Sequence, residues 1–379
     1  MQMKTHYKMK KLLYIALAFV VAACSTADPN GYKITGIIGE NVEGDLQNSS
    51  VYLLEYKNNQ YTIIDTAYIT DNQFVFDGTL ENGPFDGSIK MEKVMGRTDI
   101  FVEASDYTID ITDNLMNAIV KGGETQNLIT ELQLMENKLK SDYNIPTVLN
   151  LIENGSEEEL KKALSIFKNY REEFNIKSDS IKSKYPLSYY DLKEVANKME
   201  VLPLDSLERA LEVFVNDEKF ATSNYLNDIL ANIAKRKTLL PGNVAPDFTM
   251  KNDKNVDVTL SNVYKANKVT LIDFWASWCA PCRSNNDKLV DLYKSYHKKG
   301  LEIVGVALEK DAQEWIDASK KDKITWINLS SIEFMSSPVC ETYAITYPAQ
   351  NILVDNNGVI LAKNVKYDEL VEIIKEKCN

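Results

Sequence analysis

The sequence Trp278-Cys279-Ala280-Pro281-Cys282-Arg283 follows a continuous apolar run, residues 270–274, and opens a helical pattern over residues 285–297. A cysteine at a helix N-terminus faces unpaired backbone N–H groups and the positive end of the helix dipole, which stabilise a thiolate. Two intervening residues allow a disulfide to close, and proline at the second of them can start a helix without losing a hydrogen bond. The spacing therefore predicts a redox-active Cys279–Cys282 pair.

A C-x-x-C pair can also form half of a zinc site, which requires two further ligands. The only histidine beyond the N-terminal segment is His297, three turns or more along the helical pattern, and Cys340 and Cys378 form no second C-x-x-C. We therefore expect no metal, and no cofactor besides the disulfide itself. The absence of a histidine near Cys279 also argues against Cys-His hydrolase chemistry.

The region around the motif, residues 243–379, alternates strand and helix patterns after a Leu240-Pro241-Gly242 linker. Apolar runs at 270–274, 302–308 and 351–354 are typical of strands covered on both faces. Asp355-Asn356-Asn357-Gly358 predicts a hairpin into a strand at 359–362. These patterns predict a C-terminal α/β domain with a central sheet and flanking helices.

Three stretches resemble the TlpA/ResA-like branch of the thioredoxin superfamily, which is related to AhpC/TSA proteins: Ala245-Pro246-Asp247-Phe248, the run from Asp273 to Arg283, and Tyr347-Pro348 before a strand. The resemblance covers residues 243–379 and implies a thioredoxin fold and a thiol-disulfide oxidoreductase of the protein-disulfide reductase type. It further implies that Cys279 is the nucleophile, that Cys282 resolves the mixed disulfide, and that Pro348 is a cis-proline lying against the disulfide. The substrate-binding residues that it implies are Trp278, Ala280, Pro281 and Tyr347.

This chain differs from the branch at the acidic residue that usually transfers a proton to or from the cysteines. The branch commonly has a glutamate three residues after the second cysteine and a proline two further on, where this chain has Asn285 and Asp287. Asp273 lies six residues before Cys279, where classical thioredoxins have a buried acid, and is our candidate for the group that takes the proton from Cys282. The alternative is an aspartate paired with a nearby lysine.

Two other functions compete with the reductase. A peroxiredoxin has a threonine or serine three residues before its cysteine and a proline seven before, where this chain has Ala276 and Ile272. A thiol peroxidase is therefore disfavoured. A non-catalytic binding lipoprotein, with the N-terminal region as its active part, is disfavoured by the presence of Cys279, Cys282 and Pro348. We expect Cys340 to pack as a small hydrophobe and Cys378 to lie in a frayed C-terminal tail.

The N-terminus reads as a lipoprotein signal peptide, residues 1–23. Four lysines precede an apolar run from Leu12 to Ala23, which is too short to span a bilayer. Val21-Ala22-Ala23-Cys24 resembles the lipobox of bacterial lipoproteins, which implies lipidation of Cys24 and a tether over residues 24–30. The sequence thus predicts a protein anchored in the cell envelope on the periplasmic side.

This location and the charge of the chain set the expected partners. A net charge of −12 argues against binding nucleic acid. The expected partners are oxidised protein thiols or clients of the cytochrome-maturation type, a membrane electron donor, and the membrane itself through Cys24.

The region between tether and α/β domain divides in two. Residues 31–123 contain short runs typical of strands, with turn signals between them, which predict an all-β sandwich. The expected strands are at 33–38, 51–56, 61–68, 73–76, 99–102 and 107–111. Their order resembles an N-terminal domain of unknown function found in lipoproteins of the Bacteroidetes type. Residues 124–239 are charged and Leu-rich with helical spacing, and Ser156 with Glu159 predicts a capping box. We expect a central α-helical segment interrupted at Pro186 and Pro203.

Overall fold

The computed structural model describes residues 28–57 and 60–379, so the predicted signal peptide and Cys24 lie outside the described residues. The chain divides into two compact units, the first ending at Met135 and the second beginning at Glu136. This division falls inside helix α1 (Glu124–Asp142). The finer division into residues 31–123, 124–239 and 243–379 stays a prediction. Among the described helices, none has the length and apolar character needed to cross a membrane.

The first unit contains a β-sandwich. One sheet has the order β4-β1-β7-β8 and the other the order β3-β2-β5-β6. The strands are β1 (Gly31–Ile38), β2 (Ser50–Lys57), β3 (Gln60–Tyr68), β4 (Gln73–Thr79), β5 (Phe85–Met91), β6 (Thr98–Val102), β7 (Asp106–Ile111) and β8 (Ile119–Lys121), with a short η1 (Leu115–Asn117) before the last. Ile34 and Ile109 of the first sheet and Leu53 and Ile89 of the second are fully buried in one shared core. The predicted sandwich is confirmed, although β5 and β8 were not predicted.

The helical segment follows the sandwich. Its elements after α1 are α2 (Ile145–Asn154), α3 (Glu157–Lys182), α4 (Tyr189–Ala196), α5 (Leu204–Val215), η2 (Glu218–Phe220) and α6 (Asn224–Thr238). The capping box is confirmed, because the backbone N–H and the hydroxyl of Ser156 both donate to Glu159. Pro203 is the N-cap of α5. In α5, Leu211 and Phe214 are buried and Val215 is exposed, since the position three residues after Leu211 faces the core.

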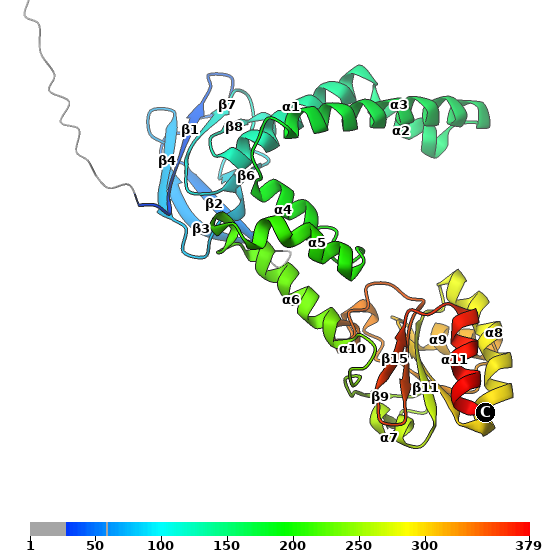
Figure 1. Cartoon of the computed structure of the whole chain (residues 1–379). Helices are drawn as coiled ribbons and strands as arrows, with labels where there is room; N and C mark the ends of the chain where they lie inside the picture. Colours follow the sequence, from blue (N-terminus) through cyan, green and yellow to red (C-terminus); the bar gives the residue numbers. More distant parts are fainter. Residues whose placement is uncertain (1–27, 58–59) are drawn as a thin grey trace, which may run out of the picture. The chain divides into compact units, whose positions relative to one another are not determined.

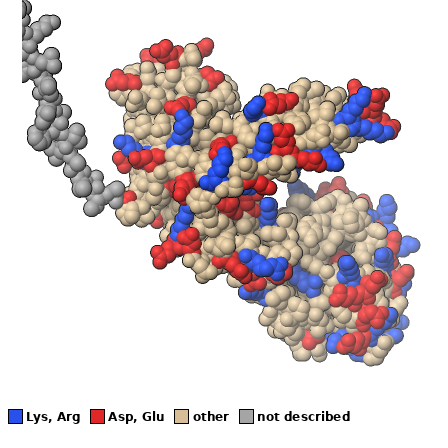
Figure 2. All heavy atoms as spheres, turned by 45° about the horizontal axis from the view of Figure 1, so that its top comes forward, with Lys and Arg blue, Asp and Glu red and all other residues tan. Residues whose placement is uncertain are grey.

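Charged side chains of both signs are interspersed on the face of the molecule drawn in Figure 2. Along α3 several of them form ion pairs one helical turn apart, such as Lys161–Glu157 and Lys162–Glu158, each at 2.7 Å. Such exposed pairs contribute little to stability. They are consistent with a solvated helix surface, as the sequence indicated.

The C-terminal part of the second unit is built on a five-stranded sheet with the order β13-β12-β11-β14-β15. The strands are β11 (Val269–Trp275), β12 (Leu301–Ala307), β13 (Ile327–Leu329), β14 (Gln350–Asp355) and β15 (Ile360–Lys363), preceded by a small hairpin of β9 (Thr249–Lys251) and β10 (Asp257–Thr259). Strand β11 is central, parallel to β12 and antiparallel to β14. All seven of its residues are buried, which confirms the strand expected at 270–274.

Helices cover both faces of this sheet (Figure 1). They are α7 (Leu260–Lys265), α8 (Ala280–Tyr296) with η3 (His297–Lys299), α9 (Ala312–Lys321), η4 (Phe334–Ser336), α10 (Pro338–Thr342) and α11 (Tyr367–Cys378). On one face Leu271 of β11 packs with residues of α8 and α11. On the other face Ile272 packs with residues of α7 and α10. Because alternate residues of β11 point to opposite faces, Asp273 and Trp275 lie on the α8 face with Leu271.

Candidate active site

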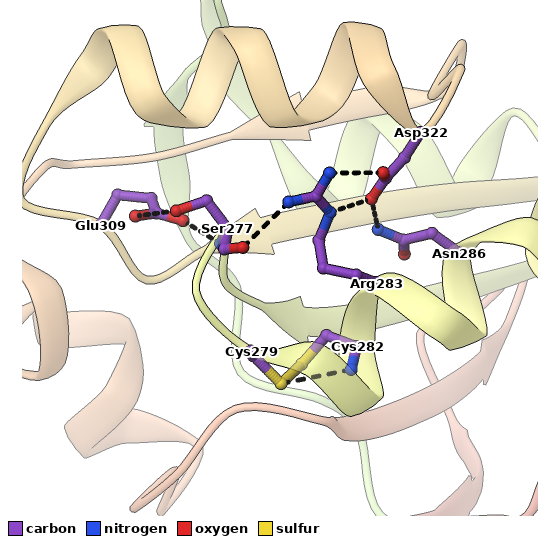
Figure 3. Close-up of a disulfide and its surroundings, with 7 residues drawn as sticks. All are labelled: Ser277, Cys279, Cys282, Arg283, Asn286, Glu309 and Asp322. Carbon is purple, nitrogen blue, oxygen red and sulfur yellow. Dashed lines mark hydrogen bonds and ion pairs between the residues drawn. A yellow bond between two sulfur atoms is a disulfide. The ribbon is translucent and has the colours of Figure 1, made fainter.

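The two cysteines of the motif form a disulfide at the start of α8, directly after β11 (Figure 3). Cys279 is the N-cap of the helix, and its Sγ accepts a hydrogen bond from the backbone N–H of Cys282 at 3.2 Å. Pro281 lies in the first turn, where its missing N–H costs no helical hydrogen bond. Both cysteines are buried, and Cys279, 7% exposed, is slightly more accessible to solvent than Cys282, 4% exposed. The predicted pair is confirmed in its oxidised form.

The predicted substrate-binding residues are open to solvent; three of them flank the cysteines in sequence and Tyr347 lies in the loop before β14. Trp278 is 54% exposed and Tyr347 53%, and both Ala280 and Pro281 are exposed. The ring of Trp278 lies 5.7 Å, centroid to centroid, from that of Phe334. These side chains can therefore contact an incoming polypeptide, while the sulfur atoms themselves are mostly covered.

Pro348 departs from the expectation. The described residues contain no cis peptide bond, so the bond between Tyr347 and Pro348 is trans and the expected cis-proline is wrong in this structure. The trans form is the lower-energy isomer of a bond before proline. The chain instead turns at Ala349, which has φ +69°, and the Ala349 N–H donates to the carbonyl oxygen of Phe274 at 2.7 Å. The loop thus still lies against the end of β11.

Asp273 is buried in β11, 5% exposed, on the face that α8 covers. Burial alone raises its pKa from 3.8 to about 7. Among the described residues its carboxyl has no recorded ion pair or side-chain hydrogen bond, so the alternative reading as half of a lysine pair finds no support. Trp275, two residues further along the same face, belongs to the apolar cluster that contains both cysteines. An acid with a pKa near neutrality can both accept and return a proton at physiological pH.

Glu309 is a second buried acid at this site, and the sequence reasoning missed it. It follows the end of β12, is 1% exposed, and accepts hydrogen bonds from the backbone N–H of Ser277 and, at 3.0 Å, from the Ser277 hydroxyl (Figure 3). Burial raises the pKa of Glu309, and the bonds from Ser277 oppose that shift. The only signal in the sequence is an acid directly after an apolar run.

Arg283 ties the same turn to α9. Its guanidinium donates to both carboxyl oxygens of Asp322, with one of these bonds at 2.6 Å, and to the carbonyl oxygen of Ser277 at 2.9 Å. Asn286 donates to the same carboxylate at 2.9 Å. Figure 3 shows these side chains as one chain of contacts from Glu309 to Asn286 beside the disulfide. The turn before Cys279 is therefore held from two sides.

The remaining cysteines lie apart from this chemistry. Cys340 is buried in α10 and burial raises the pKa of its thiol to about 11, which fits the predicted packing role. Cys378 was expected in a frayed tail, but it is buried in the last turn of α11 among apolar residues of α8 and β11, because the helix continues to the C-terminus. Among residues 28–57 and 60–379 no cluster of three or more His, Cys, Asp or Glu side chains could hold a metal ion.

A disulfide at the first turn of a helix, directly after the central strand of a sheet with helices on both faces, defines a thioredoxin-like redox domain. Comparison with known proteins agrees. Residues 241–363 match the AhpC/TSA family, and residues 32–129 match a domain of unknown function (DUF4369).

Known relatives indicate which branch of this family the chain resembles. A "Thiol-disulfide oxidoreductase ResA" of Oceanobacillus iheyensis is 42% identical over 72 residues, which are 18% of this chain and 36% of the relative. A protein of the same name from Geobacillus kaustophilus is 37% identical over 133 residues, 35% of this chain and 74% of the relative. A solved thiol-disulfide oxidoreductase from Bacteroides fragilis is 34% identical and covers 35% of this chain and 98% of that one, with a TM-score of 0.34. The chain belongs to the ResA-like thiol-disulfide oxidoreductases of the AhpC/TSA family.

Proposed function

We propose that this chain is a cell-envelope disulfide reductase that acts on protein clients through Cys279 and Cys282. The observation that carries the proposal is the disulfide at the N-terminus of α8, with a buried, unpaired acid on the adjoining strand. The two sulfurs can exchange with a client disulfide, and Asp273 can move the proton that the exchange requires. Membership of a family of thiol-disulfide oxidoreductases supports the same chemistry.

The first step starts from the reduced chain. The Cys279 thiolate, stabilised by the helix N-terminus and the Cys282 N–H, attacks one sulfur of the client disulfide. The client's S–S bond breaks, its second sulfur leaves as a thiolate and takes a proton, and a mixed disulfide joins Cys279 to the client. Cys279 is the attacking residue because it caps the helix and precedes the exposed Ala280 and Pro281.

The second step releases the client. Asp273 takes the proton of the Cys282 thiol, and the resulting thiolate attacks the Cys279 sulfur of the mixed disulfide. The mixed disulfide breaks, the client's sulfur leaves as a thiolate and takes back the proton held by Asp273, and the client departs as a dithiol while the Cys279–Cys282 disulfide remains. Two electrons have passed to the client, so a membrane electron donor must return two electrons before the next cycle. Clients of this class are oxidised envelope proteins, including those that need reduced cysteines for haem attachment.

The direction of electron flow can be tested in the cells that make the protein. A reductase supplied with electrons is held mainly as the dithiol, whereas an oxidase is held mainly as the disulfide. Rapid acid quenching, alkylation with a maleimide of known mass and mass spectrometry of the peptide containing Cys279 and Cys282 distinguish the two. We expect most of the peptide to carry two maleimides. A peptide found mainly as the unlabelled disulfide would contradict the reductase assignment.

We further propose that the chain is anchored in the membrane by lipid on Cys24 and faces the periplasm. The support is the sequence Val21-Ala22-Ala23-Cys24 after a short apolar run. Replacement Cys24→Ala should move the protein from the membrane fraction to the soluble fraction or block its processing. A Cys340→Ala variant serves as the matched control and should stay in the membrane fraction. Equal membrane retention of the Cys24→Ala protein would contradict the anchor.

A further inference from the structure

Glu309 is a buried acid that is hydrogen-bonded directly to the turn before Cys279. Its carboxylate accepts both the backbone N–H and the hydroxyl of Ser277, two residues before Cys279. We propose that Glu309 is a positioning residue that holds this turn through Ser277 and, by its negative charge, disfavours the Cys279 thiolate and makes the disulfide harder to reduce. The proposal rests on the thiol-disulfide exchange proposed above and names a residue that sets its equilibrium.

Glu309 also links the turn to the loop on its other side. Its backbone carbonyl accepts the N–H of Phe334 at 3.0 Å, and the ring of Phe334 packs on Trp278. Phe334 and Ile332 have φ values of +55° and +59°, which cost energy in residues with bulky side chains. One residue thus fixes both the turn before Cys279 and the strained loop that supports the exposed Trp278.

The surrounding charges leave Glu309 without a direct ion pair. Arg283 of α8 faces the same turn, but its guanidinium is paired with Asp322 at the end of α9. The charge of Arg283 favours ionisation of Glu309 and that of Glu314 in α9 opposes it. Lys310 lies over the ring of Phe334, 4.8 Å from its centroid. Among the described residues no cation is recorded within ion-pair distance of Glu309.

An anion without an ion-pair partner near a cysteine raises the free energy of its thiolate. Thiolate stabilisation favours the reduced form of a dithiol pair, so the carboxylate of Glu309 favours the disulfide. In this account the helix N-terminus makes Cys279 reactive, and Glu309 limits how far the thiolate is stabilised. That balance suits a protein that gives electrons to clients rather than one that takes them.

The test uses the purified chain and three variants. Glu309→Gln keeps the shape and the acceptor for Ser277 but removes the charge. Glu309→Asp keeps the charge but shortens its reach to Ser277. Glu103→Gln is the matched control, because Glu103 likewise accepts the backbone N–H and the hydroxyl of a single residue, Thr125, in the first unit. Two quantities are measured. The first is the equilibrium constant between the Cys279–Cys282 disulfide with two molecules of reduced glutathione and the Cys279–Cys282 dithiol with one molecule of glutathione disulfide. The second is the pH dependence of the rate at which Cys279 is alkylated.

Glu309→Gln should lower the pH midpoint for alkylation of Cys279. It should also shift the glutathione equilibrium about threefold towards the dithiol, which is the effect expected from removing one partly screened charge. Glu309→Asp should leave the equilibrium unchanged and slow the reduction of a client disulfide, because the turn is less firmly held. Glu103→Gln should change neither. A Glu309→Gln protein that folds and matches the wild type in both readouts would overturn the proposal, as would an equal shift of the equilibrium in Glu309→Asp.

The test of Glu309 and the test of the reductase assignment can fail independently of each other. The glutathione equilibrium and the alkylation profile are measured on the purified chain and do not depend on its electron donor. A chain found mainly as the disulfide in cells would therefore contradict the reductase assignment without touching the role of Glu309. Unfolding midpoints of all variants, measured in parallel, show whether a changed readout reflects a folded protein.

Discussion

The two units of the chain use a buried glutamate in the same way but in different surroundings. In the first unit, Glu103 accepts the backbone N–H of Thr125 at 2.9 Å and its hydroxyl at 3.0 Å, and so holds the first turn of α1. In the second, Glu309 accepts the same two donors from Ser277. The first contact holds a helix to a sandwich that has no cysteine in its described residues. The second holds the turn beside a disulfide, so the same contact there can affect a reaction.

Asp273, in β11 of the second unit, differs from these two glutamates in its hydrogen bonding. Both glutamates are buried with their hydrogen bonds made, whereas Asp273 is buried with none recorded among the described residues. A buried acid without a partner costs stability when it ionises. The comparison teaches that hydrogen-bonded acids here support the backbone, and that the unpaired one, on the face covered by α8, is the group suited to moving a proton.

The largest expected effect is on the pH dependence of stability. Asp273 has its pKa raised from 3.8 to about 7 by burial, so the unfolded chain loses this proton at lower pH than the folded one. The contribution of Asp273 is therefore full below about pH 4 and is lost as pH rises to about 7. Replacing Asp273 with Asn should increase stability relative to the wild type by about 3 kcal/mol more at pH 8 than at pH 5. Urea unfolding of the oxidised proteins at both pH values measures this difference.

The second effect is kinetic and separates Asp273 from the hydrogen-bonded acids. In the proposed mechanism Asp273 takes the proton of Cys282, so Asp273→Asn should slow release of the client by about 100-fold, in the range of general acid-base contributions, and leave the first attack nearly unchanged. Stopped-flow fluorescence with a labelled client disulfide resolves the two steps. Equal slowing of both would assign Asp273 a purely structural role.

The smallest effect is expected from the glutamate of the first unit. Glu103→Gln keeps the acceptor for the Thr125 N–H and weakens a charge-assisted bond, so it should cost about 1 kcal/mol of stability. The glutathione equilibrium of Cys279 and Cys282 should not change. A changed equilibrium in this variant would break the comparison between the two glutamates, because the first unit would then influence the redox site.

Local patterns predicted most of the fold. The apolar runs at 270–274 and 302–308 became β11 and β12, and the Ser156–Glu159 capping box begins α3 as expected. Strand β5 was not predicted; it contains Gly87, a residue type depleted in strands, at a point where a Cβ would meet the carbonyl oxygen of Leu54 at 3.2 Å. Close approach between strands is a property of the folded sheet and not of the local sequence.

The chemistry of the site was predicted where it is local and missed where it is not. Cys279 and Cys282 are three residues apart, and a motif indicates them. Glu309 reaches Ser277 across 32 residues of sequence, and this contact arises only because β11 and β12 pair in parallel, with Trp275 beside Ala307. The cis-proline expected at Pro348 is trans here, since a motif indicates a residue and not the isomer of its peptide bond.

Trapping of mixed disulfides distinguishes the roles of Cys279 and Cys282 in the reaction with clients. Cys282→Ser retains Cys279, the proposed nucleophile, and removes its proposed resolving partner, so client proteins should accumulate on Cys279. Cells expressing Cys282→Ser and, as the matched control, Cys279→Ser are quenched with acid and alkylated, and the adducts are identified by mass spectrometry. We expect client proteins attached through Cys279 in the first variant and none in the second. Adducts found only with Cys279→Ser would reverse the roles, and adducts with neither variant, together with consumption of peroxide by the wild type, would contradict the reductase.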